Sequence, residues 1–260
     1  MRIISLVENT TNKDLQTEHG LSLYIEAAGQ KILFDTGQSD LFARNAEKMS
    51  VDLKTVDICI LSHGHYDHGG GLKTFATIND TAPIYMNKNA FGLHYHGDER
   101  YIGLNRDWLH DEELQHRINY LDGGMEIDKD ISIVAPGNNR KVDMGSAGLC
   151  VKENDEYRAE DFRHEHYLLI KENGKRILIS GCSHQGIINI MDWYKPDVLI
   201  GGFHFMNQDH GETLQKYGEM LDKYDTEYYT CHCTGVEQYE FLRHYIKHLH
   251  YLSEGEEMRL

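Results

Sequence analysis

The sequence predicts an α/β protein in which two similar halves pack sheet against sheet with helices on the outside, an αββα sandwich. Three observations favour this fold. Hairpin signals dominate the first part of each half, strand–helix alternation follows in both, and several apolar runs have the length of buried strands. A chain of 260 residues can bury the core of one such domain, and we expect residues 1–260 to form it.

The apolar runs of the first half define its elements. In order, we expect a strand at 2–7, a hairpin of 21–27 and 31–34 around Gly29-Gln30, a helix through about Lys48, a strand at Val56–Leu61, a helix from Leu72 and a strand at 83–86. The run Val56–Leu61 is almost continuously apolar, which is typical of a strand buried on both faces. It leads directly into a histidine-rich loop.

The second half repeats this order of hairpin followed by alternating strands and helices. We expect a strand at 131–134, a hairpin of 166–170 and 176–180 around Asn173-Gly174, a helix at Ile187–Tyr194, a strand at Val198–Ile200, a helix over 214–224, a strand at Tyr228–Cys231 and a last helix over 236–249. Between the halves, residues 88–121 show no clear period and are rich in His, Tyr, Trp and charge. We expect them to form an inserted, lid-like segment that could close over an aromatic or heterocyclic substrate.

Composition limits the partners. The net charge of −16 disfavours nucleic acid, whose binding normally depends on Lys and Arg contacts to phosphate. A phosphorylated small molecule remains compatible, because bound cations can reverse the local sign. No stretch approaches the ~20 apolar residues that span a bilayer, and the first residues lack the apolar core of a signal peptide. We therefore expect a cytoplasmic protein with a small-molecule substrate and with no nucleic-acid or membrane partner.

Four potential metal ligands, His63, His65, Asp67 and His68, lie within six residues at the end of the buried strand. Residues two apart in an extended segment point the same way, so the rings of His63 and His65 should share one side. Neutral imidazoles and a carboxylate are ligands that zinc and iron prefer. The pattern therefore predicts a metal site. Asp35 is a candidate partner that would orient a ligating imidazole.

The motif His63-x-His65-x-Asp67-His68 after an apolar strand, with Phe34-Asp35-Thr36-Gly37 upstream, resembles the metallo-β-lactamase superfamily. Four further motifs sharpen this resemblance: Glu18–Ser22, Gly181–Ile187, Gly201–His204 and Cys231–Gly235. Together they are similar to the branch of 7,8-dihydropterin-6-methyl-4-(β-D-ribofuranosyl)aminobenzene 5′-phosphate synthase-like proteins. The resemblance extends over nearly the whole chain and implies the metallo-β-lactamase fold.

The resemblance also implies two adjacent metal positions. His63 and His65 would belong to one position, and Asp67 and His68 to the other. Zinc, as one or two ions, is the expected metal, with iron or manganese as alternatives. Asp67 would also hold the attacking water, which makes it a candidate catalytic residue.

Later segments would complete these positions. His232 matches the superfamily's last histidine, at the second position, and His184 would complete the first. Many relatives have a bridging aspartate where this chain has Cys182, so Cys182 as a thiolate or His184 would replace it. His204 is a candidate substrate contact or acid, and His19 is a further candidate. The usual mid-chain histidine motif is absent, and four histidines are considered for it without being assigned as ligands: His94, His96, His164 and His166.

These residues indicate a metal-dependent hydrolase that acts on a small phosphate-bearing or carbonyl ester substrate. Three alternatives stay open: a pterin-related C–N bond-forming synthase, an iron-dependent redox enzyme, and a non-enzymatic ligand-binding protein of the same fold. The synthase would release pyrophosphate from a pterin diphosphate. The redox enzyme would consume oxygen, and the binding protein would show no metal-dependent turnover.

Overall fold

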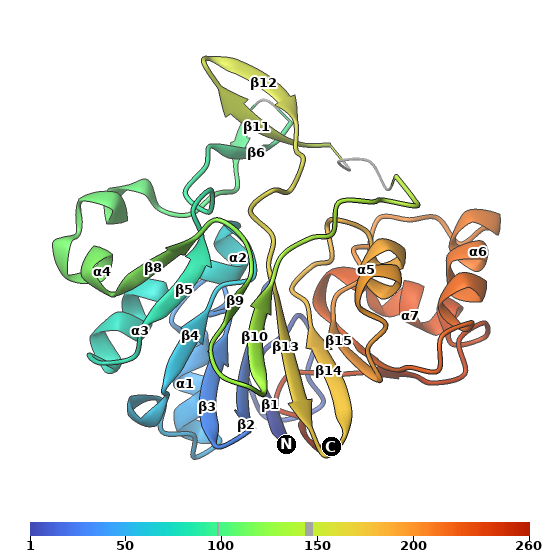
Figure 1. The fold of residues 1–260 in the computed structure, drawn as a ribbon, viewed down its shortest axis with the longest axis horizontal. Coiled ribbons are helices and arrows are strands. Elements are labelled where there is room, and N and C mark those ends of the chain that lie inside the picture. The colour runs from blue at the N-terminus through green and yellow to red at the C-terminus, as the bar shows by residue number, and fades with distance from the viewer. Residues whose placement is uncertain (98, 144–147) are drawn as a thin grey trace.

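The computed structural model describes residues 1–97, 99–143 and 148–260 and confirms the predicted αββα architecture. Two seven-stranded sheets pack face to face, and helices cover their outer faces (Figure 1). The core between the sheets is made of aliphatic side chains from both, among them Ile25 and Ile60 of the first sheet and Ile133 and Ile179 of the second. Within the described residues, no helix is long and apolar enough to cross a membrane.

The first sheet combines an antiparallel part with a parallel part. Its strands lie in the order β18 (Glu257–Arg259), β1 (Arg2–Val7), β2 (Ser22–Ala27), β3 (Gln30–Phe34), β4 (Ile58–Ile60), β5 (Ile84–Asn87) and β8 (Ile118–Leu121). Strands β1, β2 and β3 are antiparallel, as the predicted hairpin requires, whereas β3, β4, β5 and β8 run parallel. The parallel strands end at one edge of the sheet.

The second sheet has the same plan. Its order is β17 (Leu249–Tyr251), β16 (Glu227–Thr230), β15 (Val198–Gly201), β14 (Lys175–Ile179), β13 (Tyr167–Glu172), β10 (Ile131–Val134) and β9 (Met125–Glu126). Asn173 and Gly174 both have positive φ in the β13–β14 turn, as the favoured two-residue hairpin turns require. Strands β14 to β17 are parallel.

The helices close the two outer faces. They are α1 (Leu41–Lys48), α2 (Tyr66–Gly69), α3 (Leu72–Ile78), α4 (Glu112–Arg117), α5 (Ile187–Tyr194), α6 (Glu212–Leu221) and α7 (Val236–Leu242). Phe42 of α1 and Phe75 of α3 belong to the outer core of the first sheet. Helices α5, α6 and α7 supply the outer core of the second sheet. The predicted last helix is wrong in its final turns, because α7 ends at Leu242 and Leu249 begins β17.

A small third sheet lies above the two large sheets in Figure 1. Its strands are β12 (Glu156–Ala159), β11 (Leu149–Glu153), β6 (His94–His96) and β7 (Arg100–Tyr101). Strands β6 and β7 come from the expected insertion at 88–121, of which residue 98 lies outside the described residues. The same range contains β8, which is an edge strand of the first large sheet. The sequence does not predict β11 and β12, because β12 is exposed throughout and has no alternating apolar face.

Candidate metal centre

The predicted site residues come together at the edge where the parallel strands of both large sheets end. Asp35 follows β3, and His63–His68 follow β4 and continue into α2. From the other sheet, His184 follows β14, His204 follows β15 and His232 follows β16. Ligand sites of α/β proteins form at the carboxyl ends of parallel strands, because their loops meet there.

The buried carboxylate of Asp35 fixes the rings of two candidate ligands. Its Oδ2 accepts a hydrogen bond from Nδ1 of His68 at 2.7 Å and another from the hydroxyl of Ser62 at 2.7 Å. Since that hydroxyl donates to Asp35, its oxygen accepts from Nδ1 of His63, which lies 2.8 Å away. Both histidines are therefore protonated at Nδ1, which leaves the Nε2 lone pairs of His63 and His68 available to a metal ion.

Asn9 performs the corresponding task for His232. The backbone N–H of Gly20 donates to Oδ1 of Asn9 at 3.2 Å, which sets the orientation of the amide. Nδ1 of His232 lies 2.8 Å from the same Oδ1 and must donate to it. The other ring nitrogen, Nε2, therefore carries the lone pair, and it lies 3.4 Å from Oδ2 of Asp67.

The loop after β14 brings Cys182 and His184 against the histidines of the first half. Nε2 of His184 lies 3.3 Å from Nε2 of His63. Sγ of Cys182 lies 3.1 Å from Nε2 of His68. Cys182 belongs to two groups of potential ligands, one with His63 and His184 and the other with His68 and His232. Its sulfur therefore lies between the two implied metal positions.

The backbone is strained where it carries these residues. Four non-glycine residues that follow strands of this edge have a left-handed φ: Asp35 (58°), Ser183 (57°), His204 (57°) and His232 (48°). Such conformations persist only where the surroundings enforce them, and they cluster at functional sites. Buried carboxylates hold two of these segments, the one at Ser183 and the one at His232. Glu165 accepts from the backbone N–H of His184 at 2.7 Å, and Glu8 accepts from that of His232 at 2.6 Å.

The spacing and the unused donor atoms fit metal ions. Metal–ligand bonds of about 2.0–2.1 Å in a tetrahedral site separate neighbouring donors by roughly 3.3–3.4 Å. The contacts from His184 to His63, at 3.3 Å, and from His232 to Asp67, at 3.4 Å, have this separation. Among the described residues, five histidine nitrogens of this region are buried without a hydrogen-bond partner: Nε2 of His65, His164 and His232, and Nδ1 of His166 and His184. Buried polar atoms are rarely left unpaired, so these point to a missing ligand.

Burial keeps most of the cluster in the form that binds metal. It lowers the pKa of His63, His65 and His184 well below the usual value, and that of His232 to about 4, so these rings are neutral imidazoles. Burial also raises the pKa of the Cys182 thiol well above its usual value. A thiolate at this position therefore needs a cation in contact with the sulfur.

Asp67 and His68 differ from the other members. Burial disfavours the charge of Asp67, but His68, His19 and His232 outweigh it and hold the pKa of Asp67 well below its usual value. Burial opposes a charge on His68 as well, yet the carboxylates of Asp35 and Asp67 raise its pKa. The two carboxylates thus make this spot favourable for a cation, either a proton or a metal ion.

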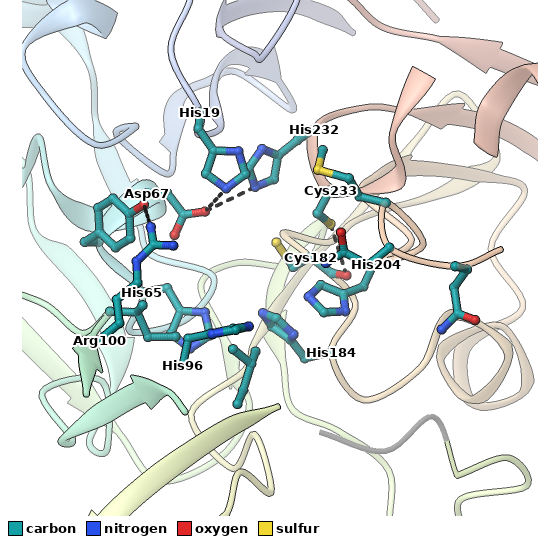
Figure 2. Close-up of a pocket in the computed structure, with 16 residues that line it drawn as sticks. His19, His65, Asp67, His96, Arg100, Cys182, His184, His204, His232 and Cys233 are labelled. Atoms are coloured by element: carbon teal, nitrogen blue, oxygen red, sulfur yellow. Dashed lines mark hydrogen bonds and ion pairs between the residues drawn. The ribbon is translucent and has the colours of Figure 1, made fainter. Parts of the chain in front are cut away.

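A cavity of about 240 Å³ opens onto the cluster (Figure 2). Predicted site residues on its wall are His19, His65, Asp67, Cys182, His184, His204 and His232. His19 reaches in from an exposed loop, with Nε2 3.2 Å from Oδ2 of Asp67. Burial lowers the pKa of His204 to about 4, so it meets the cavity as a neutral imidazole, with its ring centroid 4.4 Å from that of His184.

Comparison with known proteins agrees with this geometry. The family model of the metallo-β-lactamase superfamily matches residues 16–142. An uncharacterized protein of Methanocaldococcus jannaschii is 33% identical over 245 residues, which cover 89% of this chain and 90% of the relative. The chain belongs to the metallo-β-lactamase superfamily. Its fold implies metal ions, for which the His, Cys and Asp groups described above are the candidate ligands.

Two further relatives of this superfamily member have more specific names. A protein of Methanocaldococcus jannaschii named 7,8-dihydropterin-6-methyl-4-(beta-D-ribofuranosyl)-aminobenzene-5'-phosphate synthase is 27% identical over 266 residues, covering 91% of this chain and 88% of the relative. A crystal structure named as a metal-dependent hydrolase of the β-lactamase superfamily has a TM-score of 0.85 at 27% identity, covering 100% of this chain and 99% of that chain. One name is that of a synthase and the other that of a hydrolase.

Two further histidines near the candidate metal centre, His164 and His166, have hydrogen-bond partners that fix their rings. His164 lies within one group of potential ligands with His65 and a third histidine. However, its Nδ1 accepts a hydrogen bond from the backbone N–H of Gly64 at 2.8 Å, so the ring proton is on Nε2. His164 therefore presents an N–H group to the site. Nε2 of His166 lies 3.2 Å from the side-chain amide of Asn87.

The third member of that group, His94, is held by acceptors on both sides. Its Nδ1 lies 2.7 Å from a carboxylate oxygen of Glu160, and its Nε2 lies 3.3 Å from the backbone carbonyl of Asn89. These two contacts fix the position of the ring beside His65 and His164. His96, on the same strand, is exposed but lies on the cavity wall.

Proposed function

We propose that this superfamily member is a metal-dependent hydrolase that acts on a small phosphate-bearing or carbonyl ester substrate. One observation carries the proposal. Hydrogen bonds donated to Ser62, Asp35 and Asn9 orient the rings of His63, His68 and His232. Their Nε2 lone pairs lie next to His184, Cys182 and Asp67. The hydrolase name of the crystal structure with 27% identity supports the same reaction class.

The proposed ligands form two sets around Cys182. His63 and His184 group with Cys182, and we add His65 to this first set because its ring centroid lies 4.6 Å from that of His63 and 5.0 Å from that of His184. His68 and His232 also group with Cys182, and we add Asp67 to this second set because its Oδ2 lies 3.8 Å from Nε2 of His68 and 3.4 Å from Nε2 of His232. Imidazole and thiolate donors suit zinc or iron better than manganese, and we propose zinc. Bound divalent ions would supply Lewis acidity and would lower the pKa of water toward neutrality.

The chain's own groups would orient the reactants. Asp67 is an ionised carboxylate on the cavity wall, so it can accept a hydrogen bond from the attacking water. His204 is a neutral imidazole on the same wall and can hydrogen-bond to the substrate. Ile102, Leu149 and Met206 give the wall an apolar part against which a small organic group can pack.

Metal analysis followed by turnover tests this proposal. We expect purified protein to contain one or two zinc ions and to hydrolyse at least one class in a panel of phosphomonoesters, phosphodiesters and lactones, with a chelator abolishing turnover. His65→Ala should lose at least one metal equivalent together with activity. His116→Ala, an exposed residue of α4, is the matched control and should keep both. Protein that refuses divalent ions contradicts the proposal, and metal binding without turnover favours a ligand-binding protein.

A pterin-related C–N bond-forming synthase is the second candidate. The relative named as a synthase, 27% identical over 91% of this chain, favours it. This reaction would release pyrophosphate when a pterin diphosphate is supplied with its amine partner. A coupled pyrophosphate assay separates the two candidates, because ester hydrolysis releases none. Oxygen uptake by iron-loaded protein would instead support the redox alternative.

We also propose that residues 1–260 act as one metallo-β-lactamase-like domain. The part of the insertion 88–121 that precedes β8 would serve as the lid-like segment, since β6 and β7 bring residues to the cavity wall. A cytoplasmic location and a substrate that is a small molecule belong to the same proposal.

A further inference from the structure

The wall of the metal-site cavity carries one strong cation. Arg100, at the start of β7, lines the cavity together with Asp67, Cys182 and His232. It is the only lysine or arginine on this wall among the residues that the structure describes. Figure 2 shows Arg100 on the opposite side of the cavity from Cys233.

Among the residues that the structure describes, none is an anionic partner of Arg100. No carboxylate of the described residues lies within 4.0 Å of its guanidinium nitrogens, and Nη2 donates to the hydroxyl of Tyr66 at 3.0 Å. Arg158, on β12 at the opposite edge of the small sheet, pairs with Glu153 and Glu156. Arg106 and Arg117 also lack a carboxylate within 4.0 Å, but both donate to backbone carbonyls. What distinguishes Arg100 is its place on the wall of the metal-site cavity.

The position of Arg100 is built into the fold. In the small sheet it is the cross-strand partner of His96, which lies on the same cavity wall. The segment that follows β7 is bound to the metal loop, because Tyr66 N donates to the backbone carbonyl of Ile102 at 2.9 Å. His65 and Gly103 form a β-bridge beside this contact. The guanidinium is therefore tied to the loop that carries the candidate ligands.

We propose that Arg100, with His96 beside it, forms an anion-binding subsite that holds a phosphate or carboxylate group of the substrate next to the metal positions. The planar guanidinium matches both anions with paired N–H groups, and such charge-assisted bonds are roughly twice as strong as neutral ones. Because the chain has a net charge of −16, a fixed cation on this wall would add to the attraction that bound metal ions exert on an anion. This inference rests on the proposed function and narrows its substrates to anionic small molecules.

The test combines binding and kinetics on zinc-loaded protein. Inorganic phosphate and acetate are titrated by calorimetry into wild type, Arg100→Met and Arg100→Lys, and the two probes distinguish a phosphate subsite from a carboxylate subsite. We expect Arg100→Met to weaken the preferred anion by about tenfold or more, and Arg100→Lys to restore part of the loss. Arg158→Met makes the same charge change on the small sheet away from the cavity wall and should bind like wild type.

Kinetics separate this subsite from a structural role. For an anionic ester and its neutral analogue, Arg100→Met should raise KM for the anionic ester alone, with zinc content unchanged. Equal anion affinity in wild type and Arg100→Met overturns the proposal, and so does loss of zinc from the variant. If wild type hydrolyses neither ester, the proposed function fails, but the anion titration still decides whether Arg100 is a subsite.

Discussion

The two halves of the sandwich hold the candidate site in different ways. The first half supplies His63–His68 from one loop, and its buried carboxylate, Asp35, hydrogen-bonds to side chains. The second half supplies Cys182 and His184 from one loop and His204 and His232 from two others. Its buried carboxylate, Glu165, accepts the backbone N–H groups of His184 and Gln185. The first half therefore fixes the orientation of rings, whereas the second fixes the shape of a strained loop.

The largest expected effect comes from Asp35→Asn. The carboxylate accepts from Ser62 N, Ser62 Oγ and His68 Nδ1, and an amide cannot accept all three bonds with one oxygen. Because His63 and His68 both lose their fixed ring orientation, zinc affinity should fall by roughly 10–100-fold at both positions. Competition with a chromophoric chelator measures this loss.

Asp40→Asn is the matched control for this change. Asp40 is exposed at the start of α1, where it pairs with Arg44, and its substitution should leave zinc affinity as in wild type. Loss at only one position would mean that the hydrogen bond through Ser62 does not orient His63.

Glu165→Gln should have a smaller effect, confined to the second half. Glu165 accepts from His184 N, Gln185 N and the hydroxyl of Tyr167, and glutamine would turn an N–H₂ group toward one of these donors. The unpaired donor should lower the free energy of unfolding by about 1–3 kcal/mol. Zinc affinity should fall by less than tenfold and only at the position that includes His184.

Urea unfolding and zinc titration measure both quantities for Glu165→Gln. Glu219→Gln on the exposed face of α6 provides the control and should change neither. Equal loss of zinc affinity at both positions would show that Glu165 acts on the whole cluster, so the proposed difference between the halves would not hold.

The sequence predicts the first half of the site better than the second for a physical reason. His63, His65, Asp67 and His68 are neighbours in the chain, so their spacing alone predicts that they lie together. Asn9 and His232 are 223 residues apart, and no local pattern indicates that one orients the other. The resemblance to the metallo-β-lactamase superfamily suggests His232 and His184, but it suggests neither Asn9 nor the carboxylates that hold the loops.

The fold, too, is predicted where the sequence pattern is local and is missed where it depends on distant contacts. Buried strands and hairpins are predicted from apolar runs and from Asn173-Gly174, because these patterns are local. The last helix is predicted too long because Ile246 and Leu249 keep apolar spacing and stay in the same core after the helix has ended. Arg100 has no distinguishing sequence signal, since its role depends on the pairing of β6 with β7 and on the cavity beside them.

Another buried carboxylate, Glu254, orients no ligand ring and accepts from no candidate ligand, so it should affect stability alone. It accepts from Glu8 N at 3.2 Å and from Asn45 Nδ2 at 3.0 Å, and burial raises its pKa from 4.5 to about 7. Between these pH values the folded protein keeps a proton that the unfolded chain has lost, so this group lowers stability as the pH rises from 4.5 to 7.

Glu254→Gln removes this pH dependence. With zinc in excess, the urea midpoint of the variant minus that of wild type should increase between about pH 5 and 7 and then level off. A difference that stays constant with pH would show that Glu254 is ionised throughout. A change in zinc affinity would show that Glu254, like Asp35 and Glu165, supports the metal site.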